Sequence, residues 1–132
     1  MDNALPVTQR RGESRATVSI PAAVFAEGFH QPVELECTNL SSSGMYLAGN
    51  PSLVVDERVL LSFVPPGTPH QIFIDAVVVR TLVGGRRGVG LRFDRMPRND
   101  SDVLRSSLER RAQVARAWDA LVGDLEFDPE QN

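Results

Sequence analysis

The amino-acid sequence predicts an all-β fold: a barrel of six short antiparallel strands, followed by one C-terminal α-helix. Apolar and polar residues alternate from Ala16 to Val83, whereas apolar residues recur every three or four positions after Asn99. Clusters of turn residues separate the alternating stretches at regular intervals, as in small barrels. The chain has 132 residues, 42% of them hydrophobic, which suits a single domain with its own core.

The alternation assigns the strands one by one. In the second strand, for example, Val33, Leu35 and Cys37 alternate with polar residues, which is typical of a strand with one buried face. A proline-rich stretch at 65–69 and the pair Gly84-Gly85 are predicted turns, the latter closing a hairpin. The six strands are expected at about 16–24, 33–38, 45–48, 59–63, 71–82 and 88–93.

The C-terminal part changes to a helical period. We expect a helix over about 100–123, with Asn99 and Asp102 as a capping signal and Gly123 as the stop. The stretch 76–79 is apolar on both faces, so the helix is predicted to cover the face that the core does not use. The helical stripe is interpreted as packing, with a partner surface as the alternative; it comprises Leu104, Leu108, Arg111, Ala115, Trp118 and Val122.

One domain is therefore predicted over 9–123, preceded by a flexible lead at 1–8 and followed by an acidic tail at 124–132. The single cysteine, Cys37, excludes an intrachain disulfide and a cysteine-rich zinc site. His30 and His70 lack metal-ligand spacing, so no metal site is expected. No stretch is apolar enough to span a membrane and no secretion signal is apparent, which favours a cytoplasmic protein.

Charge is unevenly distributed along the chain. All 14 basic residues are arginine, and the formal net charge is −3. Residues 80–98 carry six arginines and one acid, whereas 16–38 carry three acids and no base. The basic window is interpreted as arginines that keep a glycine-rich hairpin soluble, and a local anion site is the alternative.

A first motif lies at the start of the barrel, where Arg10, Arg11 and Arg15 form an Arg-x-x-x-Arg pattern with one further arginine before it. Guanidinium groups bind phosphates through charge-assisted hydrogen bonds and pair with the O6/N7 edge of guanine. Taken alone, the cluster is more typical of a disordered N-terminus.

A second motif, Asn39-Leu40-Ser41-Ser42-Ser43-Gly44, joins the second and third predicted strands. Asn39 offers an amide that both donates and accepts, and Ser41 offers a hydroxyl. Gly44 permits a positive φ or the close approach of a ligand. Taken alone, this stretch is typical of a plain turn between strands.

Together, the two motifs resemble the signature of the PilZ domain family, Arg-x-x-x-Arg followed by (Asp/Asn)-x-Ser-x-x-Gly. Gly88 to Phe93 resembles the closing strand of that family, and the resemblance covers about Gln9 to Asp94. The matching positions are Arg11, Arg15, Asn39, Ser41 and Gly44, with Arg10 as the additional arginine.

The resemblance implies a six-stranded PilZ-type β-barrel that binds the bacterial second messenger cyclic di-GMP and needs no other cofactor. It implies that Arg10, Arg11 and Arg15 hold the phosphates and guanine edges, that Asn39 and Ser41 hold a guanine edge, and that Gly44 shapes the turn. We expect the arginine loop to be mobile when empty and to fold over the ligand, which would relay binding to a downstream protein partner. A homodimer is left open.

Three other functions remain as alternatives. A PilZ-fold adaptor would act by protein contact without nucleotide, although relatives of that type commonly lack the arginines that this chain has. A nucleic-acid-binding barrel is disfavoured by the negative net charge and by a single Trp and a single Tyr for base stacking. An enzyme is least favoured, because no acid–base or nucleophile constellation can be assembled.

Overall fold

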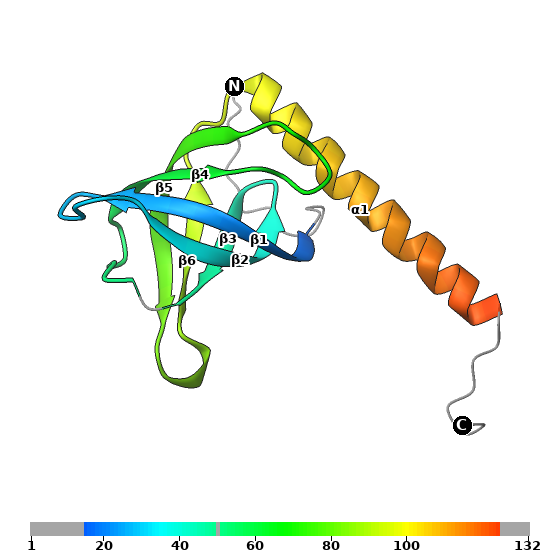
Figure 1. Ribbon diagram of the computed structural model, residues 1–132, viewed down its shortest axis with the longest axis horizontal. Helices are drawn as coiled ribbons and strands as arrows, with labels where there is room; N and C mark the ends of the chain where they lie inside the picture. Colours follow the sequence, from blue (N-terminus) through cyan, green and yellow to red (C-terminus); the bar gives the residue numbers. More distant parts are fainter. Residues whose placement is uncertain (1–14, 50, 125–132) are drawn as a thin grey trace.

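The computed structural model describes residues 15–49 and 51–124. The six strands close into a barrel in the order β1-β2-β3-β6-β5-β4, and all neighbours are antiparallel (Figure 1). The predicted fold class is confirmed. The elements are β1 (Arg15–Ala26), β2 (Val33–Ser41), β3 (Gly44–Ala48), β4 (Arg58–Phe63), β5 (Ile72–Leu82), the 3₁₀ turn η1 (Gly84–Arg86), β6 (Gly88–Phe93) and α1 (Arg98–Asp124).

Each strand turns one face to the barrel interior because its apolar residues have a period of two. In β4, Val59, Leu61 and Phe63 are buried, while Leu60 between them is 55% exposed. The predicted hairpin between β5 and β6 is confirmed, and Gly84 adopts a φ of +86° there, which favours glycine. The alternation therefore locates the core inside the barrel.

The helix α1 begins at Arg98, two residues before its predicted start. Asn99 thus lies inside the helix, within its first turn, and Asp102 lies just beyond that turn, so their predicted capping role was wrong. Leu104 and Leu108 join the hydrophobic core, each with only 1% of its surface exposed. The first half of the helix is consequently part of the domain rather than an appendage.

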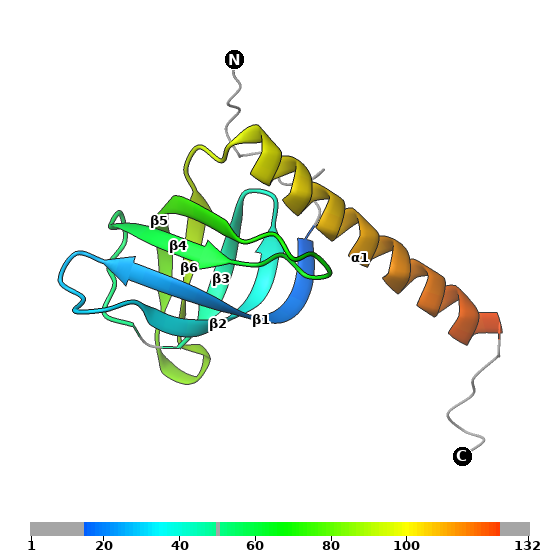
Figure 2. The ribbon, with the colours of Figure 1, turned by 45° about the horizontal axis from the view of Figure 1, so that its top comes forward.

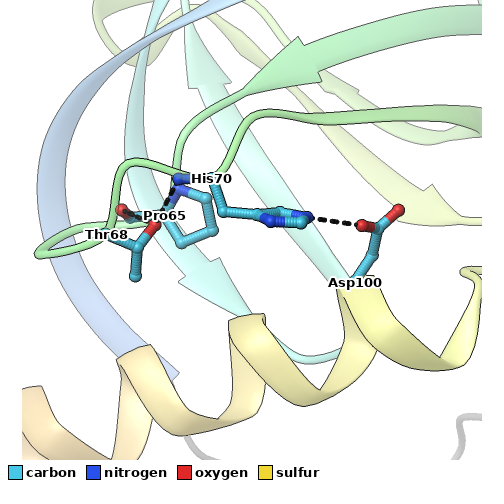
Figure 3. Close-up of polar contacts among 4 residues, drawn as sticks. All are labelled: Pro65, Thr68, His70 and Asp100. Atoms are coloured by element: carbon cyan, nitrogen blue, oxygen red, sulfur yellow. Dashed lines mark hydrogen bonds and ion pairs between the residues drawn. The ribbon is translucent and has the colours of Figure 1, made fainter.

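Polar contacts attach this half of the helix to the loop between β4 and β5. The Nε2 atom of His70 lies 2.7 Å from Oδ1 of Asp100, and the Thr68 hydroxyl accepts the backbone N–H of His70 (Figure 3). The Ser107 hydroxyl donates to the carbonyl of Pro66 at 2.6 Å. These contacts fix the start of α1 against the loop.

Two expectations about the helix were wrong. The helix packs against β1 and the β4–β5 loop, and Arg111 donates to the carbonyl of Thr17 in β1 at 3.1 Å. Val79, on the outer face of β5, remains 45% exposed, so α1 does not cover that face.

Trp118 is 64% exposed, so the helical stripe packs only in its first half. Figures 1 and 2 show the second half of α1 extending away from the barrel.

Candidate functional site

The second motif forms the tight connection between β2 and β3. Ser41 is only 6% exposed, and its hydroxyl oxygen accepts the backbone N–H groups of Ser43 and Gly44, both at 3.2 Å. The same hydroxyl lies 3.3 Å from the carbonyl oxygen of Gly44, to which it can donate. Serine hydroxyls commonly stabilise turns in this way. The side chain of Ser41 therefore organises the turn from within.

Gly44 is required by the barrel itself. Its φ is not positive, and a Cβ atom there would collide with the carbonyl oxygen of Leu91 in β6. The predicted positive φ at this glycine was therefore wrong, and the close approach of a neighbouring strand explains why a glycine is needed here. Gly44 sets the position of the turn because it lets β3 and β6 pair directly.

Asn39 lies on the outer face of the barrel wall, half-buried, next to a β-bulge in β2. Its direct partners are Thr17 on β1 and Tyr46 on β3. The thiol of Cys37 donates to the backbone carbonyl of Asn39 at 3.3 Å, which supports the bulge. Bulges of this kind redirect side chains at functional surfaces.

The last residue of the first motif, Arg15, lies beside the second motif where β1 pairs with β2. Arg15 is exposed, is the first residue of β1 and lies directly opposite Ser41. Arg10 and Arg11 lie outside the described residues, so their predicted roles remain predictions. The four described site residues therefore gather along two paired strands and the turn that follows them.

Three residues that the motif analysis missed belong to the same outer face. Tyr46 lies opposite Asn39, Arg80 on β5 lies with its guanidinium carbon 5.8 Å from the Tyr46 ring centroid, and Arg92 lies opposite Gly44. Arg80 and Arg92 belong to the basic window that was interpreted as a solubilised hairpin. They lie on strands β5 and β6 instead, where they contribute positive charge to the barrel wall.

The single acid of the basic window is paired. Asp94 accepts a hydrogen bond from Arg58 at 2.7 Å, and this contact lowers the pKa of the Asp94 carboxyl group. The pair is exposed, so its net contribution to stability is small. The paired Arg58 nevertheless offsets the charge of Asp94.

Two kinds of reactive site can be checked within residues 15–49 and 51–124, a thiol nucleophile and a metal centre. Burial raises the pKa of the Cys37 thiol to about 11, so it stays protonated at neutral pH and is a poor nucleophile. In these two ranges, no cluster of His, Cys, Asp and Glu could hold a metal ion. Across the described helices, none is long and apolar enough to cross a membrane.

The described candidate-site residues lie on the wall of the barrel and in the turn between β2 and β3. One shallow depression lies at the start of α1, between Arg98 and Arg105, and another lies on β1 and β2 beside Glu34 and Glu36. Neither includes Asn39 or Arg15, and the second carries the wrong charge for a phosphate.

Solved structures resemble this fold at low sequence identity. The PilZ domain of YcgR from Escherichia coli, solved with c-di-GMP, is 18% identical at a TM-score of 0.60, over 83% of this chain and 98% of that one. The PilZ domain of CeSA from a cellulose-synthesizing bacterium is 17% identical at a TM-score of 0.55, over 74% and 97%.

The inhibitor of motility MotI/DgrA from Bacillus subtilis is 20% identical at a TM-score of 0.66, with 80% of this chain aligned. The alignment spans 53% of that protein, about half its length. A comparison with curated protein sequences gave no significant match.

The family comparison covers most of the chain. The profile of the PilZ domain matches residues 9–110, which include all six strands and the packed half of α1. The matched range also contains both motifs. The chain therefore belongs to the PilZ domain family.

Proposed function

We propose that this protein is a non-enzymatic, cytoplasmic receptor for cyclic di-GMP that passes the binding event to a protein partner. Arg10, Arg11 and Arg15 bind the phosphates and guanine edges, and Asn39 binds a guanine edge. Ser41 and Gly44 act mainly by holding the turn beside them in shape. Phosphate contacts supply attraction and base contacts supply discrimination.

The observation that carries the proposal is the register between β1 and β2. Because Arg15 pairs with Ser41 and Thr17 pairs with Asn39, the arginine motif leads directly onto the strand beside the second motif. Cyclic di-GMP carries two phosphates and two guanines, so it needs cations and base-edge groups on one surface. Membership of the PilZ family, and the c-di-GMP complex of the YcgR PilZ domain, add support.

Calorimetric titration with cyclic di-GMP tests the proposal. Wild-type protein should bind, and Arg11→Ala and Asn39→Ala should each weaken binding about tenfold or more, because each removes hydrogen bonds to an ionised group or a base edge. Arg116→Ala and Gln113→Ala, which make the same chemical changes on the exposed half of α1, should bind as wild type does. Trypsin cleavage after Arg10 or Arg11 should slow when ligand is added.

The opposite outcome is equally informative. If wild-type protein releases no heat at high micromolar cyclic di-GMP, the receptor proposal fails. The PilZ-fold adaptor, acting by protein contact alone, then becomes the preferred function. If both site variants keep wild-type affinity, ligand binds elsewhere and the assigned residues are wrong.

A further inference from the structure

One row of paired residues crosses the barrel wall beside the candidate site. Thr17 pairs with Asn39, Asn39 with Tyr46, Tyr46 with Gly90, and Gly90 with Arg80. Directly opposite residues in antiparallel strands share a face, with Cβ atoms about 4.5–5.5 Å apart. The row therefore places an amide, an aromatic ring and a guanidinium group on one outer surface, although they come from three different strands.

Glycines in β6 make this arrangement possible. A Cβ atom at Gly88 would collide with the ring and hydroxyl of Tyr46, so the tyrosine lies across a position without a side chain. At Gly90 a Cβ atom would lie 3.7 Å from Cβ of Arg80 and 3.9 Å from Cδ1 of Tyr46. The tyrosine and the arginine thus approach each other from two sides of Gly90, across the surface of β6.

The contact between Tyr46 and Arg80 is a long one. The Arg80 guanidinium carbon lies 5.8 Å from the centre of the Tyr46 ring, near the outer limit of about 6 Å for a cation–π contact. Arg80 is exposed on its strand, so its guanidinium can shift without opening the core. A planar ligand could then contact both the Tyr46 ring and the Arg80 guanidinium group.

We propose that Tyr46 and Arg80 form a stacking platform for the guanine whose edge meets Asn39. A base that lies flat over the tyrosine ring directs its edge sideways along the row, toward the amide of Asn39. Aromatic rings and guanidinium planes are the usual stacking partners of unpaired bases. The inference rests on the proposed binding of cyclic di-GMP and adds two specificity-determining residues that neither motif contains.

Affinity measurements test the platform directly. Tyr46→Leu and Arg80→Ala should each weaken cyclic di-GMP binding about tenfold, since stacking on one aromatic group commonly contributes that much. Tyr46→Phe should retain most of the affinity because it keeps the ring. Phe73→Leu removes an aromatic ring that is 69% exposed elsewhere on β5, and it should have no effect.

A spectroscopic measurement separates stacking from a loss of structure. Tyr46 is the only tyrosine of the chain, so selective labelling gives NMR signals from a single ring. Adding cyclic di-GMP should shift these signals upfield, as expected for a ring stacked on a base. The measurement uses wild-type protein and so does not depend on the folding of a variant.

The outcomes distinguish the two proposals. If wild-type protein binds cyclic di-GMP but the Tyr46 signals do not move, or Tyr46→Leu binds as tightly as wild type, the platform is refuted and the receptor function stands. If wild-type protein does not bind cyclic di-GMP at all, both proposals fall. Upfield shifts together with weakened binding by Tyr46→Leu establish the platform.

Discussion

Both halves of α1 carry large apolar residues, but their surroundings differ. In the first half, Leu104 and Leu108 are each 1% exposed and Ser107 is hydrogen-bonded to the β4–β5 loop. In the second half, the large apolar residues Trp118 and Leu121 are exposed by 64% and 50%. A helical period thus identifies an apolar face without determining what covers it.

The projecting half must be stabilised mainly by local terms. It contains four alanines, the strongest helix former, at Ala112, Ala115, Ala117 and Ala120. It also continues a helix whose first turns are fixed by packing, so it avoids the unfavourable nucleation step. Substitutions in the two halves should therefore differ sharply in their effect on folding.

The largest effect on stability is expected when Leu108 is replaced. Leu108→Ala should lower the free energy of unfolding by about 2–5 kcal/mol, because it leaves a cavity in a closely packed core. Leu121→Ala, the same change in the projecting half, should cost about 0.5 kcal/mol or less. Urea unfolding of both variants gives the comparison, and equal losses would show that the two halves are equally buried in solution.

A smaller loss of stability is expected when Ser107 is replaced. Ser107→Ala should cost about 1–3 kcal/mol, because the buried hydroxyl no longer satisfies the carbonyl of Pro66. The neighbouring Ser106 is exposed, so Ser106→Ala is a matched control that should change stability little. Thermal unfolding measures both; indistinguishable melting temperatures would mean that the Ser107 hydrogen bond contributes nothing.

The contact between His70 and Asp100 should contribute less to the free energy of unfolding than the Ser107 hydrogen bond does. Both side chains are partly exposed, so we expect a coupling energy of about 0.5–1.5 kcal/mol. A double-mutant cycle with His70→Ala, Asp100→Ala and the combined variant isolates this energy from the effect of Asp100 on the helix dipole. Strict additivity of the two single changes would argue against the contact.

The smallest effect is expected at Trp118. Trp118→Ala should change the free energy of unfolding by no more than about 0.5 kcal/mol, because the side chain is mostly in solvent. Trp118 is the only tryptophan, so its fluorescence reports on this position alone. Emission should be red-shifted and readily quenched by acrylamide; a blue-shifted, protected signal would show that something covers the projecting half.

Local patterns predicted the barrel well because each strand buries every second residue. The predicted strands at 59–63 and 88–93, for example, agree with β4 and β6 to within one residue. The position of α1 was predicted wrongly, since its contacts with the β4–β5 loop depend on tertiary packing that periodicity does not report. The start of the helix was also predicted two residues too late, since α1 begins at Arg98 and Asn99 lies inside it.

The candidate site was predictable only in part. The motifs identified Asn39 and its turn, since the required residue types are adjacent in the sequence. The row from Asn39 to Arg80 depends on register across several strands, and the burial of Ser41 depends on the folded turn around it. Arg80 in particular follows a β-bulge in β5, which no pattern of alternation reveals.

The close fit of Gly44 against the Leu91 carbonyl limits which positions can be substituted in related sequences. In a related chain that does not bind nucleotide, the arginines and Asn39 could be replaced without harm. Any side chain at position 44 would still push two strands apart. The presence of that glycine therefore indicates only that the barrel closes. Whether a related chain binds the nucleotide must be judged from the exposed groups around the glycine.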